Sequence, residues 1–377
     1  MRVTSAVLTE IGSSRPYGAS RPLQLEELDL EGPGPGEVLV RVAAAGVCHS
    51  DLSVVDGVRP RPVPMVLGHE AAGVVEATGE GVNHVHQGDH VVFAFVPSCG
   101  DCVPCLSGRP ALCERGALAN TAGTLLSGRR PFTRPDGAAV NQHLGVSAFS
   151  ERTVAAAASV VPVPAELPLE QAALFGCALL TGVGAVLNTA KAEPGSDALV
   201  VGLGGVGLAA VMGARLAGCQ RVVAVDLDPG KLELAGQVGA TDVMAAGPEA
   251  VEQVRQVTGG GADYAFEAAG HPDALALAYA ATARGGTTVG IGLPHPDQRF
   301  SLPALSLVAE ERRLVGSYMG SAVPRRDIPR YIRLFMDGRM PVDRLAGGTF
   351  ALAEVNEAME ALAGGAVARQ VVLMSGH

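Results

Sequence analysis

The sequence predicts an α/β protein built from a β-rich domain and a doubly wound parallel sheet. A chain of 377 residues is longer than one ordinary core accommodates, so two domains are expected. Residues before about 170 read as short strands separated by turns rich in Gly and Pro. Beyond that point strands alternate with helical segments, which is typical of a parallel sheet with helices on both faces.

The first part is expected to hold short strands around a cysteine-rich loop. Apolar and alternating runs predict strands at 23–28, 37–42, 74–78 and 90–95, with a turn at 33–36. Segment 99–113 is rich in Gly and Pro and is predicted to be a loop. Residues 114–145 lack periodicity and are predicted to form a long excursion with solvated arginines at Arg129, Arg130 and Arg134.

The second part is expected to begin with an apolar helix over residues 169–187. Its parallel sheet is predicted to contain strands at 197–201, 221–226, 263–267, 287–291 and 313–317. The tail is predicted to form helices at 328–337 and 353–363 and a final strand at 369–374.

Charge and composition exclude some classes of partner. The formal net charge is −10 and the pI is about 5.4. Such an acidic surface argues against binding to nucleic acid or to anionic lipid. The N-terminus lacks the apolar core of a signal peptide, and thiols in metal-binding spacing fit a reducing compartment, so a cytoplasmic protein is expected.

Two apolar stretches, 172–190 and 198–214, resemble membrane spans by composition. Glycines interrupt both, and the second reads better as a buried strand that turns into a packed helix. No membrane span is therefore predicted.

A glycine motif follows the first strand of the predicted parallel sheet. Gly202, Gly204 and Gly207 form G-x-G-x-x-G between an apolar strand and an apolar helix, which is the context that a dinucleotide-binding turn requires. The first glycine permits a tight turn, the second lets a pyrophosphate approach the backbone, and the third allows close packing. Asp226 ends the next strand, where a carboxylate accepts hydrogen bonds from ribose hydroxyls and repels a 2′-phosphate, so NAD is favoured over NADP. Glycines that serve packing alone are the alternative.

Four of the seven cysteines form a local cluster. Cys99, Cys102, Cys105 and Cys113 follow the pattern C-x2-C-x2-C-x7-C. Four thiolates close a tetrahedron around zinc, which is a structural site. An iron–sulfur cluster is the main alternative, but the x7 gap disfavours it. Cys219, at the end of a predicted helix, is expected to pack in the core.

Cys48, His69 and Cys177 suggest a second zinc site. Two thiolates and one imidazole leave a fourth position open for a reacting molecule. Their spacing alone is weak evidence, since a lone buried cysteine is usually a small hydrophobe. Local context strengthens it: Asp51 would fix the tautomer of the histidine, and Glu70 would lie behind the metal or ligate it.

The sequence resembles the zinc-dependent alcohol dehydrogenases of the medium-chain dehydrogenase/reductase superfamily. The resemblance covers the whole chain, in order, through the runs Cys48-His49-Ser50-Asp51, Gly68-His69-Glu70, Cys99 to Cys113, Cys177 with Thr181-Gly182, Gly202 to Gly207, and Asp226. The long segment after Cys113 points to the long-form branch, which includes class I, class III and aryl-alcohol enzymes. The resemblance implies a GroES-like catalytic domain (residues 1–178 and 321–377) around a Rossmann NAD-binding domain (179–320), with the active cleft between them.

The resemblance also implies roles for single residues. Ser50 would bind the alcohol oxygen and pass its proton outward, beside a catalytic zinc held by Cys48, His69 and Cys177. The cofactor contacts implied by motif and resemblance together are His49, Thr181, Gly202, Gly204, Gly205, Val206, Gly207, Asp226, Lys231 and Arg369. The substrate pocket would be lined by Phe95, Phe149, Leu293 and Tyr318.

Two departures from the family pattern matter. Ser53 stands where a relay histidine is common, so a proton would leave through Ser53, a ribose hydroxyl or water. The residues that hold glutathione in the glutathione-dependent branch are not evident: Gly57-Val58-Arg59-Pro60 follows Asp56, and Ala117 lies near the expected arginine.

The expected function is hydride transfer between a primary alcohol or its aldehyde and NAD, with two zinc ions per chain. Leu, Phe and Tyr at the pocket positions suggest an apolar or aromatic substrate. A polyol or thiol-adduct (formaldehyde) dehydrogenase on the same scaffold is the alternative, and a non-catalytic dinucleotide-binding protein is a remote one. The family habit of pairing Rossmann sheets predicts a homodimer, with a tetramer as the alternative.

Overall fold

The computed structural model describes residues 1–365 and 369–374. These residues form two compact units: Met1–Cys177, Val323–Ile332 and the chain from Ala346 onward make the first, and Ala178–Ala322 with Arg333–Leu345 makes the second. The predicted boundaries at 178/179 and 320/321 lie within two residues of these. Residues 333–345, which the sequence assigns to the first domain, group with the second unit.

The first unit contains a closed barrel and a larger mixed sheet. The barrel order is β1-β2-β7-β8-β4, from strands Arg2–Leu8, Leu23–Leu30, Phe132–Thr133, Ala139–Gln142 and Met65–Val66. The larger sheet has the order β10-β6-β5-β3-β18-β17, with β9 also pairing β3. Its strands are Val160–Pro162 (β10), His90–Phe93 (β6), Glu70–Thr78 (β5), Glu37–Gly46 (β3), Arg369–Leu373 (β18), Ala346–Ala351 (β17) and Arg152–Ala156 (β9).

Short helices connect the strands of this β-rich unit. They are α1 (Tyr17–Ser20), α2 (His49–Val55), α3 (Val103–Leu106), α4 (Glu114–Ala122), α5 (Leu169–Ala172) and α13 (Val355–Ala363), with 3-10 turns at Pro110–Leu112, Ala157–Ser159, Ala173–Gly176 and Leu352–Glu354. Strand β3 lies at the centre and is almost wholly buried, because β5, β9 and β18 pair with it antiparallel. Apolar side chains of β3, β5, β6 and α13 share one core, and the barrel interior forms another.

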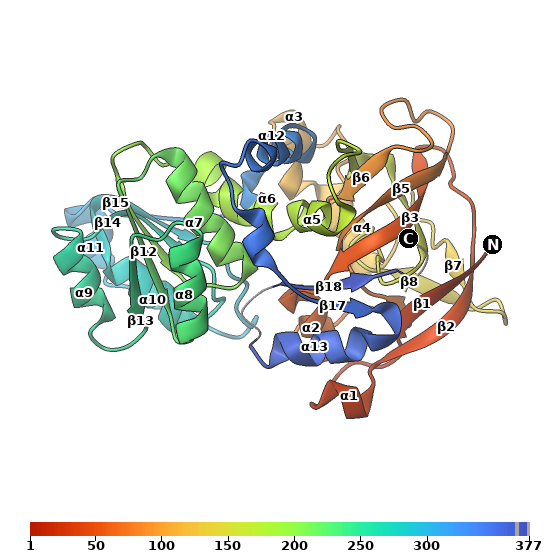
Figure 1. The fold of residues 1–377 in the computed structure, drawn as a ribbon, viewed down its shortest axis with the longest axis horizontal. Coiled ribbons are helices and arrows are strands. Elements are labelled where there is room, and N and C mark those ends of the chain that lie inside the picture. Colours follow the sequence, from red (N-terminus) through yellow and green to blue (C-terminus); the bar gives the residue numbers. More distant parts are fainter. Residues whose placement is uncertain (366–368, 375–377) are drawn as a thin grey trace. The chain divides into compact units, whose positions relative to one another are not determined.

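The second unit is a six-stranded parallel sheet in the order β13-β12-β11-β14-β15-β16. Its strands are Asp197–Val201 (β11), Arg221–Asp226 (β12), Asp242–Ala245 (β13), Ala262–Glu267 (β14), Thr282–Gly290 (β15) and Arg313–Gly316 (β16). The helices are α6 (Ala178–Gly184), α7 (Gly205–Ala217), α8 (Pro229–Gln237), α9 (Ala250–Val257), α10 (Pro272–Ala280) and α11 (Ala304–Ala309), with a π-helical turn at Ala185–Ala190 and 3-10 turns at Met319–Ser321 and Val342–Leu345. Helix α12 (Pro324–Met336) begins in the first unit and ends in the second. Figure 1 shows this sheet with its helices packed around it.

The strand order reverses between β11 and β14, as in a dinucleotide-binding sheet. The predicted fold class is therefore confirmed. The glycine turn follows β11, which is one of the two strands at this switch point.

Several sequence predictions were wrong in detail. The predicted helix 169–187 is interrupted at Cys177, whose φ/ψ of −134°/−74° is not helical. The 99–113 segment contains α3, and the excursion over 114–145 contains α4, β7 and β8. Strands β13 and β17 were missed because each is short and has exposed positions.

The three excursion arginines form hydrogen bonds with other residues, and Arg130 is also exposed as predicted. Arg129 bonds Glu37 and Glu31, Arg130 bonds Asn141 at 2.8 Å, and Arg134 bonds Glu26 at 2.7 Å. Arg134 thereby ties the excursion to β2, Arg129 ties it to Glu31 and to the start of β3, and the Arg130 bond lies within the excursion.

Within the described ranges, no single helix is long and apolar enough to cross a membrane, although the bent pair Leu169–Gly176 and Ala178–Ala190 reaches the required length and composition together.

Candidate active site

The first candidate ligand, Cys48, lies where β3 passes into α2. Cys48 is the N-cap of α2, and its backbone N–H donates to Asp51 Oδ2 at 3.0 Å. Asp51 therefore caps the helix and fixes the backbone of the cysteine. At Gly46 an added Cβ would lie 2.9 Å from the Glu70 side chain, so glycine lets β3 approach Glu70 closely.

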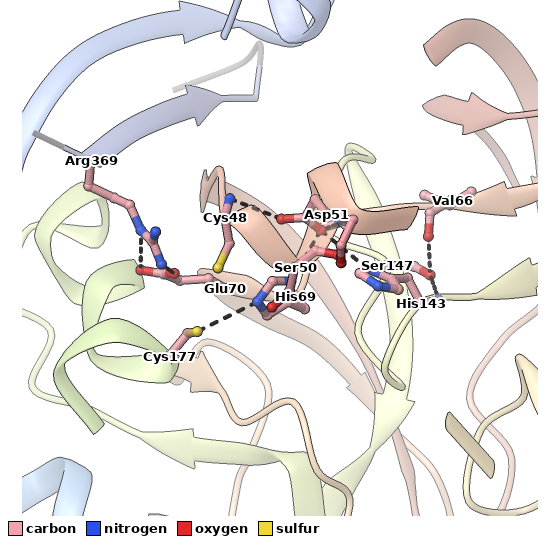
Figure 2. A network of polar contacts seen from close by, with 12 residues as sticks. Cys48, Ser50, Asp51, Val66, His69, Glu70, His143, Ser147, Cys177 and Arg369 are labelled. Carbon is pink, nitrogen blue, oxygen red and sulfur yellow. Dashed lines mark hydrogen bonds and ion pairs between the residues drawn. The ribbon is translucent and has the colours of Figure 1, made fainter. Parts of the chain in front are cut away.

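His69 lies between β4 and β5 and is turned by Asp51. Its Nδ1 lies 3.1 Å from Asp51 Oδ1, and its Nε2 lies 3.5 Å from Cys177 Sγ. An Nδ1–H directed at the carboxylate leaves Nε2 as the free lone pair, which is the arrangement of a metal ligand. The preceding Gly68 has φ +88°, and an added Cβ would lie 2.7 Å from Phe149 N. Figure 2 shows the ring held between Asp51 and Cys177.

Cys177 completes the cluster from the break between the 3-10 turn Ala173–Gly176 and α6. The thiols of Cys48 and Cys177 and the imidazole of His69 lie within 4.8 Å of one another. The three residues are 7%, 6% and 1% exposed, respectively. The chain thus brings together three residues that the sequence separates widely, and the helix breaks where the third is needed.

The neighbouring charges and hydrogen bonds shift the pKa values of the three candidate ligands. A hydrogen bond from Cys177 and the charge of Arg369 hold the pKa of Cys48 well below its usual range, although burial opposes this. The neighbouring Cys48 sulfur, and burial, raise the pKa of Cys177. Burial disfavours the His69 imidazolium, but the Asp51 carboxylate outweighs it and raises the pKa of His69. A metal ion would take the place of these protons.

Glu70 and Arg369 form a buried ion pair behind the cluster. The Arg369 guanidinium donates to both Glu70 oxygens, and the two side chains are almost fully buried. Burial raises the pKa of Glu70, and the Arg369 charge opposes that rise. The structure thus places Glu70 behind the thiols, and places Arg369, predicted as a pyrophosphate contact, against Glu70.

The two serines of α2 differ in their surroundings. Ser50 is half-buried on the first turn of α2. Ser53 is buried, and its Oγ donates to the Ser50 carbonyl at 2.9 Å. The Ser53 proton is therefore directed to backbone in this structure. His49 lies exposed at the start of the same helix.

Two of the four predicted pocket residues lie beside the Gly68-His69 segment. Phe95 meets the His69 ring edge to face, with ring centroids 5.6 Å apart. Phe149 is fully buried and packs against Gly68. Leu293 and Tyr318 belong to the second unit, where both are partly exposed.

The four local cysteines form a separate cluster on the first unit. Cys99, Cys102, Cys105 and Cys113 have their sulfurs within 4.8 Å of one another, and Cys102 Sγ lies 3.9 Å from Cys113 Sγ. A zinc–sulfur bond of about 2.3 Å in a tetrahedron requires sulfurs roughly 3.8 Å apart. Backbone N–H groups of Cys99 and Gly116 donate to Cys113 Sγ at 3.2 and 3.3 Å. A Cys105 N–H lowers the pKa of Cys102 to about 7, whereas burial raises the pKa of Cys105 to about 12.

In the second unit the glycine turn has the predicted geometry. Gly202 has φ +89°, and an added Cβ at Gly207 would lie 1.8 Å from Gly202 O, so both positions require glycine. A Cβ at Gly204, the N-cap of α7, would meet open space. Asp226 Oδ2 accepts a hydrogen bond from Leu203 N at 2.6 Å, which fixes the carboxylate beside the turn.

The other predicted cofactor residues are spread over the two units. Gly205 and Val206 begin α7, Lys231 lies in the first turn of α8, and Thr181 is buried in α6. His49 and Arg369 belong to the first unit.

Two buried ionisable residues were missed by the sequence analysis. His143 reaches Asp51, and Glu267, at the end of β14, accepts a hydrogen bond from Gly270 N at 2.6 Å. Burial raises the pKa of Glu267. Neither belongs to a recognisable motif, so only the fold reveals them.

Comparisons with known proteins agree with this geometry. Residues 34–165 match the alcohol dehydrogenase GroES-like domain, and residues 205–337 match the zinc-binding dehydrogenase domain. The chain is 40% identical to a putative alcohol dehydrogenase D of Mycobacterium tuberculosis, over 99% of this chain and 100% of that protein. It is 37% identical to an S-(hydroxymethyl)glutathione dehydrogenase of Synechocystis, with the same coverage.

Solved structures give the same picture. A zinc-binding-domain alcohol dehydrogenase protein from Burkholderia ambifaria is 35% identical with a TM-score of 0.94, and benzyl alcohol dehydrogenase from Acinetobacter calcoaceticus is 31% identical with a TM-score of 0.92; each covers 100% of both chains. Acetophenone reductase from Geotrichum candidum in complex with NAD is 27% identical with a TM-score of 0.77, over 99% of this chain and 97% of that one.

Proposed function

The chain belongs to the zinc-type alcohol dehydrogenases of the medium-chain dehydrogenase/reductase superfamily, and we propose that it interconverts a primary alcohol and its aldehyde with NAD as the hydride acceptor. The observation that carries the proposal is the buried set of two thiols and one imidazole, in which His69 Nε2 faces Cys177 Sγ. Such a set holds zinc and leaves one position for a substrate oxygen.

The donor sets fit two zinc ions per chain with different roles. Cys48, His69 and Cys177 would hold an open-site zinc, and the four cysteines from Cys99 to Cys113 would hold a closed, structural one. Zinc at the open site supplies Lewis acidity, which lowers the pKa of an alcohol hydroxyl.

The protein's own side chains would orient the site and carry the proton. Asp51 holds the His69 ring and the Cys48 backbone. Ser50 would accept the hydroxyl proton and release it to solvent through water, a ribose hydroxyl or Ser53. The Glu70–Arg369 pair places a fixed cation close to the Cys48 thiolate. In balance, the alcohol loses one hydride to NAD⁺ and one proton to solvent, giving aldehyde and NADH.

The second unit supports NAD as the dinucleotide. The open space at Gly204 suits close approach of a pyrophosphate, which the N-terminal amides of α7 would bind. The Asp226 carboxylate, fixed by Leu203 N, would accept ribose hydroxyls and repel a 2′-phosphate. Lys231, Thr181, His49 and Arg369 are proposed as further contacts, and the NAD complex of the Geotrichum enzyme is consistent with this choice.

An apolar or aromatic alcohol suits the surroundings of His69. Phe95 presents its ring to His69, and Phe149 packs beside it. The resemblance to a benzyl alcohol dehydrogenase favours the same class. A thiol-adduct dehydrogenase is a second candidate because the Synechocystis relative acts, by its name, on S-(hydroxymethyl)glutathione. Leu293 and Tyr318 are proposed as further pocket residues.

We also propose a homodimer, with a tetramer as the alternative. Strand β16 is an edge of the parallel sheet, and Leu314 on it and Leu305 and Val308 on α11 are exposed. An unpaired edge strand with apolar side chains favours pairing with a second copy. Light scattering on the purified protein tests this, and a monomeric mass would contradict it.

The test of function is NADH formation across a panel of alcohols, with zinc quantified in the same preparation. The panel contains ethanol, hexanol, benzyl alcohol, a terpenoid alcohol, sorbitol, and formaldehyde with and without glutathione, each with NAD and with NADP. Turnover of hexanol or benzyl alcohol with NAD and about two zinc ions per chain is expected. Turnover restricted to sorbitol or to the glutathione adduct would overturn the substrate class, and a preference for NADP would overturn the role of Asp226.

A further inference from the structure

His143 is a buried histidine that the proposed reaction does not use. It begins the turn between β8 and β9, and its side chain is 2% exposed. Its backbone N–H donates to Ser147 Oγ at 2.8 Å, and Ser147 Oγ donates to Val66 O at 2.8 Å. Val66 lies three residues before His69. The turn is therefore fastened to the strand that leads into a candidate metal ligand.

The backbone of the turn that His143 begins is fixed against the segment before His69. Leu144 and Ser147 have φ of 51° and 53°, in the left-handed region that non-glycine residues rarely adopt. Backbone bonds from Ala148 N to Gly68 O and from Phe149 N to Leu67 O, both 3.0 Å, close the turn against residues 67–68. Strain of this kind persists only where the surroundings fix it, and it often accompanies a functional site.

The His143 imidazole is directed at Asp51. Its Nδ1 lies 3.3 Å from Asp51 Oδ1, without the alignment of a good hydrogen bond, and this buried nitrogen has no other polar partner among the described residues. The rings of His143 and His69 meet edge to face with centroids 5.5 Å apart. Arg61 contributes a further positive charge nearby. Figure 2 shows both rings converging on the one carboxylate.

Asp51 connects two of the three candidate zinc ligands. Oδ2 accepts from Cys48 N at 3.0 Å, while Oδ1 accepts from Gly68 N at 3.2 Å and faces His69 Nδ1 at 3.1 Å. The carboxylate is fully buried and has no access to water. A group that holds Asp51 therefore fixes both the Cys48 backbone and the His69 ring.

We propose that His143 is a positioning residue for the catalytic zinc site, which acts by presenting its Nδ1–H to the Asp51 carboxylate and so holds His69 and Cys48 in ligating geometry. The inference rests on the proposed function in that it requires zinc at Cys48, His69 and Cys177. Groups that orient ligands from behind in this way contribute substantially to metal retention.

A second metal ion is the competing explanation, because Asp51, His69 and His143 also lie within 4.8 Å of one another. Two observations disfavour it. Both Asp51 oxygens already accept backbone N–H groups, and a metal there would have to share the His69 ring with the open site.

The test compares His143→Leu with His143→Asn in the zinc-loaded full-length protein. Asparagine places an amide N–H where the imidazole Nδ1–H lies, whereas leucine has a similar branched shape and no donor. The rate of zinc transfer to excess chromogenic chelator is followed, with the four-cysteine zinc as an internal reference. His84→Leu is the control, because the His84 ring bonds backbone groups of Ala157, at 3.0 Å, and Val160, which belong to neither zinc cluster.

His143→Leu is expected to release one zinc about 10- to 100-fold faster than wild type, with the other unchanged. His143→Asn and His84→Leu are expected to stay within roughly threefold of wild type on the same scale. In the cobalt-substituted protein, the visible spectrum should shift in His143→Leu and return towards wild type in His143→Asn.

Equal zinc release from His143→Leu and wild type would overturn the inference, as would an Asn variant as fast as the Leu variant, since packing alone would then explain the effect. Three zinc ions in wild type and two in His143→Leu would establish the second-metal explanation instead. Wild type that holds only the four-cysteine zinc would overturn the proposed function itself. Failure of the proposed function is thus distinguishable from failure of the role of His143, because the zinc content of wild type shows it without any variant.

Discussion

The two cysteine clusters of the first unit are built in opposite ways. Cys99 to Cys113 lie within one short segment whose two helical turns, α3 and Pro110–Leu112, carry little buried apolar surface. Val103, Leu106 and Leu118 around them are more than 70% exposed. Cys48, His69 and Cys177 come from three distant segments, and all three are buried.

The difference indicates what holds each cluster together. The local cluster has few side-chain contacts besides its own thiols, so its geometry depends on the metal. The distant cluster is set by the fold: Asp51 ties two ligands, the Glu70–Arg369 pair lies behind them, and Gly46 and Gly68 allow the close approach. Loss of the metal from the local cluster is therefore expected to disorder its segment, and loss of the metal from the distant cluster is expected to abolish the reaction.

The largest expected effect is that of Cys48→Ala. Loss of one of three ligands should remove the open-site zinc and lower turnover about 1000-fold or more, since its Lewis acidity is worth roughly 4 kcal/mol of barrier. NAD affinity should be nearly unchanged, because the glycine turn lies in the other unit. Turnover and zinc content are measured together with NAD binding by fluorescence.

Cys219→Ala is the matched control for this substitution, because Cys219 is also buried but lies in the second unit, where its Sγ contacts Ser196 Oγ at 3.4 Å. It should keep both zinc ions and full turnover. Retention of activity in Cys48→Ala would show that the distant cluster does not carry the chemistry.

The next largest effect is expected for Cys105→Ala in the local cluster. Loss of this thiolate should release the structural zinc and open the segment around α3 and α4. Each 1.4 kcal/mol of lost local stability raises cleavage there about tenfold, so limited proteolysis with mass mapping measures the change. The open-site zinc should remain.

Ser107→Ala is the matched control, because Ser107 lies two residues further on and its hydroxyl donates to Val103 O at 2.8 Å. It should leave the cleavage pattern unchanged. If Cys105→Ala were equally resistant to protease, the local cluster would be held by its fold, like the distant one.

The same contrast explains what the sequence predicts well. The four-cysteine site and the glycine turn are local patterns, so their spacing determines their geometry. The joining of Cys48, His69 and Cys177 depends on how β3, β5 and the broken helix meet, and it was predicted from ligand type and local context together with the family resemblance. His143 lies 92 positions from Asp51, and Arg369 lies 299 positions from Glu70. No short motif marks either pair. Strand β13 was missed because four residues with alternating exposure give too weak a pattern.

An effect on stability, rather than on turnover or local cleavage, is expected for Arg369→Met. Removing one partner of a buried ion pair leaves Glu70 charged and unpaired, which typically costs about 3–5 kcal/mol. Urea unfolding of the zinc-loaded protein measures this. The double variant Glu70→Met with Arg369→Met should recover most of the loss, because no buried charge is then left alone. If the double variant stayed as unstable as Arg369→Met, the loss would come from the missing charge beside the cysteines and not from an unpaired Glu70.

The smallest effect is expected for Asp101→Asn, beside the local cluster. A hydrogen bond from Cys99 lowers the pKa of Asp101, and Arg115 lies 3.2 Å away, but the carboxylate is exposed. A lowered pKa stabilises the fold above the ordinary value of about 3.9 and loses that contribution as pH falls further. Solvent screening leaves little of it, so the urea midpoint of Asp101→Asn should coincide with that of wild type from pH 7 down to about pH 3.

The corresponding carboxylate of the distant cluster, Asp51, also has a lowered pKa, but it is fully buried between two ligands. For Asp51→Asn the wild-type loss of stability below about pH 4 should flatten, and the midpoint at pH 7 should fall. The pKa of both carboxylates is lowered, Asp51 by the neighbouring His69 and His143 against the opposing effect of burial, and Asp101 by Cys99 and Arg115, so the two variants compare a buried carboxylate with an exposed one. A pH profile for Asp101→Asn that is as altered as that of Asp51→Asn would remove the distinction between the clusters.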